Sequence, residues 1–365
     1  KGENPKDIPF EKYEKIELVM NMDVIEKLGL EVPNKMLANA ELVGIEMKKP
    51  KEKKKIGIVQ FAMEPNVELC KDGILGALKV NGYKDGVNLD IIYKNAQADF
   101  SMINSIMQDM IRRDVDIIIP LSTPCVQSAV QNVGNRKKPI VCFTYIYDPY
   151  KIGAAKTPTD HLPNMTGVSC FPPVEEMLDL IKEVFPKRKD IGIVWNSSEA
   201  NSEAVVSKFR AYAEKIDLNI IEATVTNPSE VVDASKSLVA NGAEVFLNPG
   251  DNTLNVSFDA FAKAADQNQI PVFSIDADFV RNGALIGLGP DYFETGWDGG
   301  EYLVKILEGA DPAKMPIYHS PETQLLINRD IMEKHDFKIP DEVLKRANKI
   351  YSRQNKENEL KKEKK

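Results

Sequence analysis

The chain has 365 residues, of which 43% are hydrophobic and 28% charged, and its 21 glycines and 22 prolines are too few for a fibrous or low-complexity protein. Its net charge of −8 is unevenly distributed, because residues 56–344 hold 26 basic and 41 acidic residues, which argues against a nucleic acid partner. No stretch approaches the roughly 20 apolar residues of a membrane span.

The two ends of the chain carry an internal repeat. Residues 2–43 resemble residues 309–350 at a constant offset of 307, and the identical pairs are Gly2/Gly309, Pro5/Pro312, Pro9/Pro316, Asn21/Asn328, Asp23/Asp330, Glu26/Glu333, Lys27/Lys334, Pro33/Pro340, Leu37/Leu344 and Ala40/Ala347. A loop with a single strand cannot bury a core alone, so we expect residues 1–47 to be the C-terminal remnant of a preceding tandem copy. The alternative is a short helical unit that was duplicated for its own purpose. Residues 48–55 are predicted to be a Lys-rich linker and residues 351–365 a charged tail.

From Ile56 onward, strand-like and helical segments alternate. The apolar runs of strand length are residues 56–61, 89–93, 116–121, 139–145, 190–195, 219–225, 244–248, 271–275, 284–289 and 324–328. A period near 3.6 predicts helices over residues 67–81, 102–113, 174–184, 202–216, 228–241 and 257–267. Strands that are apolar at consecutive positions are buried on both faces, which is typical of parallel sheets flanked by helices. Ten such strands predict an α/β protein with two lobes.

Polar and aromatic side chains follow six of these strands. Ligands of parallel sheets bind beyond the carboxyl ends of the strands, so these residues are the candidate ligand-binding set: Gln60, Met63, Glu64, Ser122, Thr123, Phe143, Thr144, Tyr145, Asn196, Glu199, Asn201, Ser202, Asp251, Asn252 and Asp276. Ser122 and Thr123 open a helix and suit a carboxylate, although simple helix capping also explains them. Asp251 and Asp276 suit an ammonium group, although Asp is also common in turns for local reasons. The aromatic residues Phe143, Tyr145, Phe171 and Tyr292 either form a wall of the site or belong to the core.

Signatures of catalysis and of metal binding are absent from the sequence. It contains none of the patterns G-x-x-x-x-G-K-[ST], G-x-S-x-G or H-E-x-x-H. Cys70, Cys125, Cys142 and Cys170 have no C-x-x-C spacing, and we expect buried free thiols rather than a disulfide. Three widely separated histidines argue against a metal centre. We therefore predict no catalytic residue, no metal and no cofactor, as in a binding protein.

A series of short motifs, in this order, runs through the body of the chain: GIVQF followed by PNV, then PLSTP, FTYxYDP, NxTGVS, IVWNSSEANS, PGDNT and ALIGLGPDYFETG. In this order they resemble the ABC-transporter substrate-binding protein family, whose members include tryptophan- and tyrosine-type binding proteins. The resemblance covers about residues 53–350. The family's C-terminal pattern is also similar to NRDIMEKxxFxIP at residues 328–340 and to NMDVIEKLGLxVP at residues 21–33, which favours the remnant of a tandem copy.

The resemblance implies a type I periplasmic-binding-protein fold. In this fold two Rossmann-like lobes with parallel sheets are joined by three crossovers and close over a ligand by a hinge motion. The implied first lobe is residues 56–168 plus 284–312, and the implied second lobe is residues 169–283 plus 313–350. The implied crossovers lie near residues 168–172, 283–286 and 311–324.

The resemblance also assigns roles within the candidate set. It implies that Ser122, Thr123 and Thr144 of the first lobe hold the carboxylate of the ligand, and that Tyr292 also faces the cleft from this lobe. The second lobe would close over the ligand with Asn196, Glu199, Asn201 and Ser202. The ammonium group of the ligand would be neutralised by Asp251, Asn252 and Asp276. The implied function is extracytoplasmic capture of a small zwitterion such as tryptophan or tyrosine for ABC permease subunits, by a monomer without a cofactor. Trp195 and the Phe143–Tyr145 segment depart from the family pattern and leave the ligand's identity open. The alternative function is a ligand-sensing module of a receptor or signalling protein.

Overall fold

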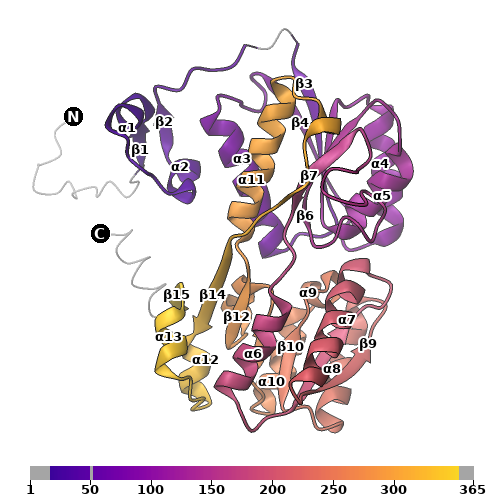
Figure 1. Cartoon of the computed structure of the whole chain (residues 1–365), viewed down its shortest axis with the longest axis vertical. Helices are drawn as coiled ribbons and strands as arrows, with labels where there is room; N and C mark the ends of the chain where they lie inside the picture. The colour runs from indigo at the N-terminus through magenta and orange to yellow at the C-terminus, as the bar shows by residue number, and fades with distance from the viewer. Residues whose placement is uncertain (1–16, 50–51, 353–365) are drawn as a thin grey trace, which may run out of the picture.

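The computed structural model describes residues 17–49 and 52–352, which form two stacked α/β lobes and a small N-terminal unit beside the first lobe (Figure 1). The predicted α/β class with mostly parallel sheets and two lobes is confirmed. Within these residues, no helix combines the length and the apolar character needed to cross a membrane.

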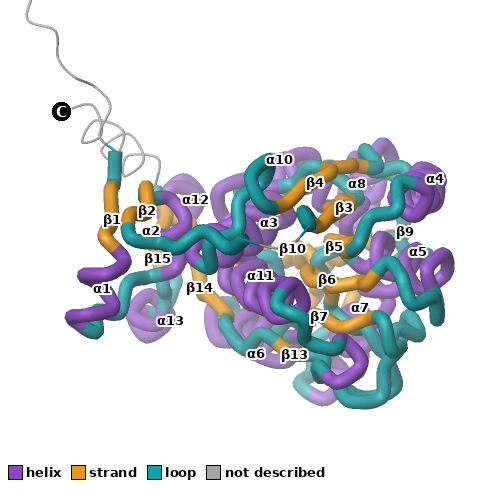
Figure 2. The backbone as a smooth tube through the Cα atoms, turned by 90° about the horizontal axis from the view of Figure 1, so that it is seen from above, coloured by secondary structure: helices purple, strands orange, loops and turns teal. Residues whose placement is uncertain are grey.

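The first lobe is built on a six-stranded parallel sheet in the order β13-β7-β6-β5-β3-β4. Its strands are β3 (Lys54–Gln60), β4 (Leu89–Asn95), β5 (Ile117–Leu121), β6 (Ile140–Ile146), β7 (Met165–Ser169) and β13 (Tyr318–His319). Its helices are α3 (Pro65–Val80), α4 (Phe100–Arg112), α5 (Thr123–Val133) and α11 (Tyr292–Leu307). Helices α3 and α11 cover one face and α4 and α5 the other (Figure 2). Ile117 and Ile119 pack on the first face and Ile118 on the second, which is the two-sided burial expected from consecutive apolar residues.

Helix α11 is held in the first lobe by close contact of its backbone with α3. A Cβ atom on Gly73 would lie 2.1 Å from the carbonyl oxygen of Phe293, and one on Gly296 would lie 1.9 Å from that of Cys70. Only glycine permits this approach of two helix backbones.

The second lobe is built on a seven-stranded sheet in the order β15-β14-β12-β11-β10-β8-β9, parallel except for the antiparallel pair β12–β14. Its strands are β8 (Asp190–Trp195), β9 (Asn219–Thr224), β10 (Val245–Asn248), β11 (Val272–Ser274), β12 (Ile286–Pro290), β14 (Thr323–Asn328) and β15 (Lys349–Tyr351). Its helices are α6 (Val174–Val184), α7 (Ala200–Lys215), α8 (Val231–Ala240), α9 (Asn252–Val256), α10 (Phe258–Gln267), α12 (Arg329–Lys334) and α13 (Asp341–Arg346). The 3-10 helices are η1 (Pro228–Glu230), η2 (Ala277–Asn282) and, near the first lobe, η3 (Pro312–Lys314).

Three connections cross between the lobes: from β7 to α6, from β12 to α11, and from β13 to β14. The expected boundaries of the lobes are therefore wrong at two places. Residues 284–290 belong to the second lobe, because β12 pairs with β11 and β14. Residues 315–319 belong to the first lobe, where β13 pairs with β7. An apolar run in the sequence predicts a strand. Which sheet the strand joins depends on the strands it pairs with in the folded chain.

Each of the ten predicted strands has a counterpart in the structure, and β7, β13 and β15 were not predicted. Strand β7 has the sequence MTGVS, whose threonine, glycine and serine interrupt the apolar pattern. Strand β3 begins at Lys54, so the predicted linker extends two residues too far. The prediction for the cysteines is confirmed, since all four are free and buried.

The N-terminal unit consists of β1 (Val19–Asn21), α1 (Met22–Leu28), α2 (Asn34–Asn39) and β2 (Glu41–Val43). Strands β1 and β2 form a separate two-stranded parallel sheet. This unit repeats the order β14-α12-α13-β15 at the end of the second lobe. The remainder of the predicted remnant, residues 1–16, and the predicted tail from residue 353 lie outside the described residues.

Candidate functional site

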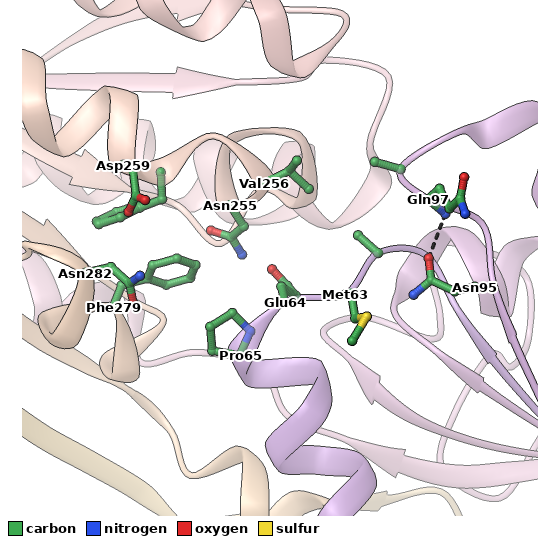
Figure 3. A pocket seen from close by; sticks show the side chains of 13 residues that line it. Met63, Glu64, Pro65, Asn95, Gln97, Asn255, Val256, Asp259, Phe279 and Asn282 are labelled. Atoms are coloured by element: carbon green, nitrogen blue, oxygen red, sulfur yellow. Dashed lines mark hydrogen bonds between the residues drawn. The ribbon is translucent and has the colours of Figure 1, made fainter.

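The loops that follow strands β3, β5, β6, β8, β10 and β11 meet between the lobes, where they supply the lining of the hollows and the contacts across them. A cavity of about 500 Å³ lies there, and Figure 3 shows Glu64 and Asn255 pointing toward each other across it. It is lined from the first lobe by Ala62, Met63, Glu64, Pro65, Asn95, Gln97 and Ala98, and from the second lobe by Asn255, Val256, Phe258, Asp259, Phe279 and Asn282. A second, much smaller hollow of about 10 Å³ is lined by Ser122, Thr123, Tyr145, Tyr147, Asn201, Gly250 and Asn252. The hydroxyl of Tyr145 links the two hollows, because it donates to Glu64 Oε1 at 2.7 Å.

Glu64 is the buried carboxyl group at the start of α3. Its Oε1 accepts from Tyr145, whereas its Oε2 is buried and has no hydrogen-bond partner among the described residues. Burial and the nearby charge of Asp276 raise the pKa of Glu64 to about 8, against the opposing effects of the Tyr145 and Asn255 side chains. At neutral pH this carboxyl group is therefore mainly protonated, and a cation beside it would favour its ionised form.

Asp276 joins the two lobes across the cleft. Its Oδ1 accepts from the hydroxyl groups of Tyr147, at 2.9 Å, and Tyr292, both of which belong to the first lobe. Its Oδ2 accepts from Asn255 Nδ2 at 2.7 Å within the second lobe. Burial raises the pKa of Asp276, and these three hydrogen bonds oppose that shift. Because two of its donors come from the other lobe, Asp276 stabilises the closed arrangement of the lobes.

Three tyrosines and one phenylalanine form two pairs of aromatic rings next to the small hollow. The rings of Tyr145 and Tyr292 meet edge to face at a centroid distance of 4.7 Å, and those of Tyr147 and Phe171 at 6.3 Å. Tyr145 and Tyr147 line the hollow, whereas Phe143, another residue of the predicted aromatic set, packs in the core cluster with Val126 and Ile146.

Ser122 and Tyr145 approach the cleft with unusual backbone conformations. Ser122 has φ +85° between β5 and α5, and Tyr145 has φ +56° at an irregularity in the pairing of β6 with β7. Positive φ is uncommon for residues other than glycine and is concentrated at functional sites. Ser122 and Asn201 line the small hollow, and Ser122 Oγ and Asn201 Oδ1, like Glu64 Oε2, are buried without partners among the described residues.

Two buried carboxylates organise the loops of the second lobe. Asp251 caps α9 by accepting from the Leu254 N–H at 2.7 Å, and it also accepts from the Asn196 N–H and the Ser202 hydroxyl group. The geometry does not support the prediction that Asp251 faces an ammonium group, because both of its oxygens are engaged in these bonds. Burial is the main cause that raises its pKa.

Glu199 holds the same loop from the other side. Its Oε1 accepts from the N–H and the hydroxyl group of Thr253, and its Oε2 accepts from the Asn252 N–H. Burial and the charge of Asp251 raise the pKa of Glu199 to about 8. Glu199, Asn196 and Ser202 therefore shape the rim of the cleft from within the second lobe, and their hydrogen bonds are made to protein groups.

The structure does not bring two further candidates into the cleft. Thr144 packs against α11, where its hydroxyl group lies 3.4 Å from the carbonyl oxygen of Thr295. Gln60 donates to Glu68 of α3 at 2.9 Å. Alternation along a strand explains the placement of Thr144, because Cys142 on the same side of β6 also faces α11, through Gly299. The candidates that line the hollows or bridge the lobes are Met63, Glu64, Ser122, Thr123, Tyr145, Asn201, Asn252, Asp276 and Tyr292.

Sequence reasoning missed Tyr147, Asn255, Phe279 and Asn66. Tyr147 follows Tyr145 in the motif FTYxYDP, and Asn66 lies in the motif PNV, so both stood within motifs already noted. The two polar side-chain atoms of Asn66 are buried without partners among the described residues. Asn255 lies three residues after Asn252, a spacing that places both on one face of a helix. No local signal pointed to Phe279, since η2 was not predicted.

Metal ligands are not grouped in this part of the molecule. Among residues 17–49 and 52–352, no three His, Cys, Asp or Glu side chains are placed to hold a metal ion together. The groups that line the two hollows are hydroxyl, amide, carboxyl and aromatic groups, together with apolar side chains.

Comparisons with known proteins agree on one family. A family model described as ABC transporter substrate binding protein matches residues 55–351. A tyrosine-binding protein of Clostridioides difficile is 34% identical over 286 residues, which are 78% of this chain and 82% of that protein. A solved ABC domain of Streptococcus pneumoniae in complex with L-Trp is 28% identical, with a TM-score of 0.78 over 82% of this chain and 100% of that chain.

A second solved relative is a ligand-free protein in an open form. A substrate-binding protein of Clostridium difficile in its ligand-free, open form is 33% identical over 82% of this chain and 99% of that chain, but its TM-score is 0.62.

Proposed function

The chain belongs to the ABC transporter substrate-binding protein family, and from this premise we propose that it binds tryptophan or tyrosine in the cleft between its lobes. It is the solute-binding component of an ABC importer, with the two-lobed fold of type I periplasmic binding proteins. One observation carries the choice of ligand. Three buried polar atoms without partners among the described residues, Glu64 Oε2, Ser122 Oγ and Asn201 Oδ1, lie near Tyr145, and the cavity beside Glu64 is lined by both apolar and polar side chains.

The ammonium group of the amino acid is assigned to Glu64. Its free Oε2 is an acceptor, and the neighbouring charge of Asp276 adds negative potential at this end of the cleft. A charge-assisted hydrogen bond of this kind contributes about 1.5–3 kcal/mol. Asp251 and Glu199 are engaged by the second lobe, whereas Glu64 offers a buried carboxyl oxygen without a protein partner among the described residues.

The carboxylate of the amino acid is assigned to Ser122 and Thr123. They lie at the start of α5, an 11-residue helix whose first N–H groups favour an anion. Asn201 reaches the same hollow from the second lobe. Tyr145 stands between the two charged ends, since it lines this hollow and also donates to Glu64.

The aromatic ring is assigned to the cavity of about 500 Å³ beside Glu64, which lies within the usual size range of small-molecule sites. Ala62, Pro65, Val256 and Phe279 supply apolar surface on both sides of it. Removing an aromatic ring from water contributes on the order of 2–3 kcal/mol. We further propose that the protein binds its ligand without catalysis and acts as a monomer. It would act outside the cytoplasm and deliver the ligand to a permease. Family membership favours this transport role over the sensing role.

Isothermal titration calorimetry with four compounds tests the proposal. Tryptophan and tyrosine are expected to bind, whereas tryptamine, which lacks the carboxylate, and indole-3-propionate, which lacks the ammonium group, should each bind at least about thirtyfold more weakly, in line with about 2 kcal/mol per charged end. Equal binding of tryptophan and indole-3-propionate would contradict the assignment of Glu64. A set of the other amino acids serves as the control for selectivity. If none of the aromatic amino acids binds, the proposed ligand is wrong.

The affinity for tryptophan should depend on pH through Glu64. In the empty protein the pKa of Glu64 is raised to about 8, and an ammonium group beside the carboxylate would lower it. Binding then releases a proton below pH 8, so affinity should rise by up to about tenfold per pH unit as the pH increases toward 8. Calorimetry in buffers of different ionisation enthalpy measures the released proton. An affinity that is constant across this range, with no proton release, would rule out Glu64 as the ammonium partner.

A further inference from the structure

The N-terminal unit reproduces the C-terminal unit of the second lobe element by element. With the offset of 307, α1 and α12 begin at equivalent residues, as do α2 and α13. The Glu41 N–H donates to the carbonyl oxygen of Leu18 at 2.6 Å, just as the Asn348 N–H donates to that of Leu325 at 2.8 Å. The repeat in the sequence is therefore also a repeat in the hydrogen bonds that join the two strands of each unit.

The local details of the two units agree as well. Asn21 caps α1 and Asn328 caps α12, each through its side chain. After these helices the chain turns through Gly29 at φ +61° and Asp336 at φ +52°. Because these caps and turns coincide, the two units present their side chains in the same arrangement.

The two units differ in what covers their apolar side chains. In the C-terminal unit Leu326, Phe337 and Val343 are buried, with exposed fractions of 4%, 8% and 0%. Their counterparts in the N-terminal unit are exposed, with fractions of 53% for Val19, 53% for Leu30 and 44% for Met36. A folded domain normally covers a contiguous apolar surface of this kind, so the exposed face is suited to a partner.

The C-terminal unit shows what covers such a face. Strand β14 pairs in antiparallel orientation with β12 and so extends the sheet of the second lobe. The ring of Phe337 packs against Phe185 beyond the end of α6, at a centroid distance of 5.7 Å, and Lys334 pairs with Asp266 of α10. Lys27 of the N-terminal unit occupies the position of Lys334.

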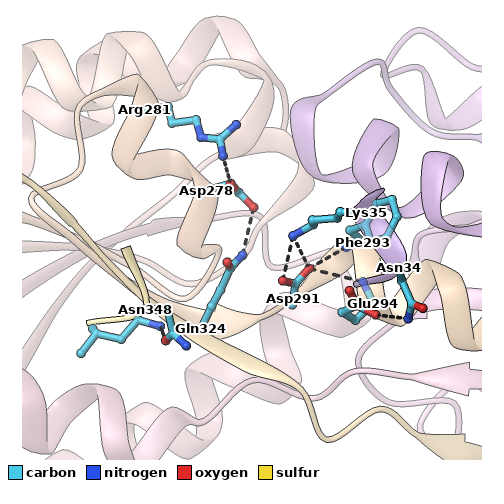
Figure 4. A network of polar contacts seen from close by, with 10 residues as sticks. Asn34, Lys35, Asp278, Arg281, Asp291, Phe293, Glu294, Gln324 and Asn348 are labelled. Carbon is cyan, nitrogen blue, oxygen red and sulfur yellow. Dashed lines mark hydrogen bonds and ion pairs between the residues drawn. The ribbon is translucent and has the colours of Figure 1, made fainter. Parts of the chain in front are cut away.

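The N-terminal unit is attached to the first lobe through a different face. Asn34 Nδ2 donates to Glu294 at 2.7 Å, and Lys35 pairs with Asp291 at 3.0 Å (Figure 4). Lys79 of α3 donates to the carbonyl oxygen of Ala38 at 2.9 Å. In the C-terminal unit the counterparts of these α2 residues, at positions 341, 342 and 345, are exposed. The contact with the first lobe therefore leaves the apolar face of the N-terminal unit uncovered.

We propose that residues 18–43 complete the second lobe of another domain of this same fold, one that stands before them in the same polypeptide. In that domain β1 would pair with the strand equivalent to β12, and Leu30 and Met36 would fill the places that Phe337 and Val343 fill here. The order along the chain supports this partner. The C-terminal unit follows the rest of the second lobe that it completes, so the N-terminal unit is expected to follow the lobe that it completes. Residues 48–53 then connect one domain to the next, and the contact with α3 and α11 fixes their relative orientation.

An exchange of the two units in the full chain tests the proposal. Residues 323–351 are replaced by a copy of residues 16–44, and the native N-terminal unit is kept. The exchanged chain should unfold cooperatively, within about 10 °C of the melting temperature of the parent, since apolar residues replace apolar residues in the core and the larger Met36 offsets part of the volume lost at Leu30 and Val19. A chain that fails to fold would overturn the proposal.

Two variants with matched substitutions control this experiment. Leu30→Asp with Met36→Asp in the transplanted copy should lower the melting temperature by on the order of 20 °C, because both charges would enter the core. The same two substitutions in the N-terminal unit of the parent should change the melting temperature of the parent by less than about 2 °C, since both sites are exposed there. If the substitutions in the transplanted copy have no effect, the copy is not docked and the proposal fails. A dimer of the parent that these substitutions abolish would assign the face to a second copy of the chain, and it would also overturn the proposal.

Discussion

Replacing Glu64 with glutamine should weaken tryptophan binding about a hundredfold, the cost of about 3 kcal/mol expected when one partner of a buried charge pair is removed. Glutamine keeps the size of the side chain and can still accept from Tyr145, so the change removes mainly the negative charge. It should also abolish the rise of affinity with pH below 8, because the titrating group is gone. Calorimetric titration of tryptophan at several pH values measures both effects.

Glu68→Gln is the matched control for this variant. Glu68 lies one turn further along α3, where it interacts with Gln60 and Lys71 at the side of the helix. The same chemical change there should leave both the affinity and its pH dependence unaltered. If Glu64→Gln and Glu68→Gln bind tryptophan equally well, the ammonium group is not held by Glu64. A loss of affinity in Glu64→Gln that keeps the pH dependence would assign that dependence to another group.

Introducing a side chain at Gly250 should weaken ligand binding about thirtyfold by obstructing closure of the lobes. Gly250 belongs to the second lobe, and a Cβ atom on it would lie 2.2 Å from the hydroxyl oxygen of Tyr147 in the first lobe. This overlap exists only when the lobes are together. Gly250→Ala should therefore raise the free energy of the closed form relative to the open form by about 2 kcal/mol, a cost typical of overpacking in a protein core. Tryptophan affinity and the radius of gyration in solution, measured with and without ligand, report the two consequences.

Gly242→Ala separates this effect from backbone strain. Both glycines have positive φ, +72° for Gly250 and +85° for Gly242, but nothing lies within 4 Å of a Cβ atom on Gly242. Alanine is strained at either position, so a similar small loss of stability is expected in both variants. Only Gly250→Ala should lose affinity and remain open in the presence of tryptophan. Equal affinities of the two variants would show that the contact between Gly250 and Tyr147 plays no part in binding.

These predictions depend on a closed arrangement that the hydrogen bonds of Asp276 describe directly. Tyr147 and Tyr292 reach this carboxylate from the first lobe, while Asn255 reaches it from the second. In an open form the two tyrosine hydroxyl groups and the carboxylate would be exchanged to water. A ligand held in the proposed way would add contacts from both lobes to this bridge, and its binding energy would shift the population toward the closed form.

The sequence was enough to predict which residues lie near the cleft, but it did not show what each of their side chains contacts. The carboxyl ends of the predicted strands pointed to Glu64, Ser122, Tyr145 and Asp276, which the structure places at the cleft; their part in ligand binding stays a prediction. The same reasoning also assigned Asp251 to an ammonium group, because an aspartate in a turn is identical in sequence whether it caps a helix or faces a ligand. Its hydrogen bonds to Asn196 and Ser202 come from a loop about 50 residues away, and no local pattern reveals them.

The sequence by itself determined the α/β alternation, the existence of two lobes and the internal repeat. These depend on apolar periodicity and on identity at a constant offset, which are properties of neighbouring residues or of aligned segments. Only the tertiary structure decided that β12 joins the second sheet, that Thr144 faces α11, and that Val19, Leu30 and Met36 lie exposed while their counterparts are buried. The physical reason is that strand pairing and burial are made by residues far apart in the chain. The same apolar residue is core or docking surface according to what the rest of the molecule places against it.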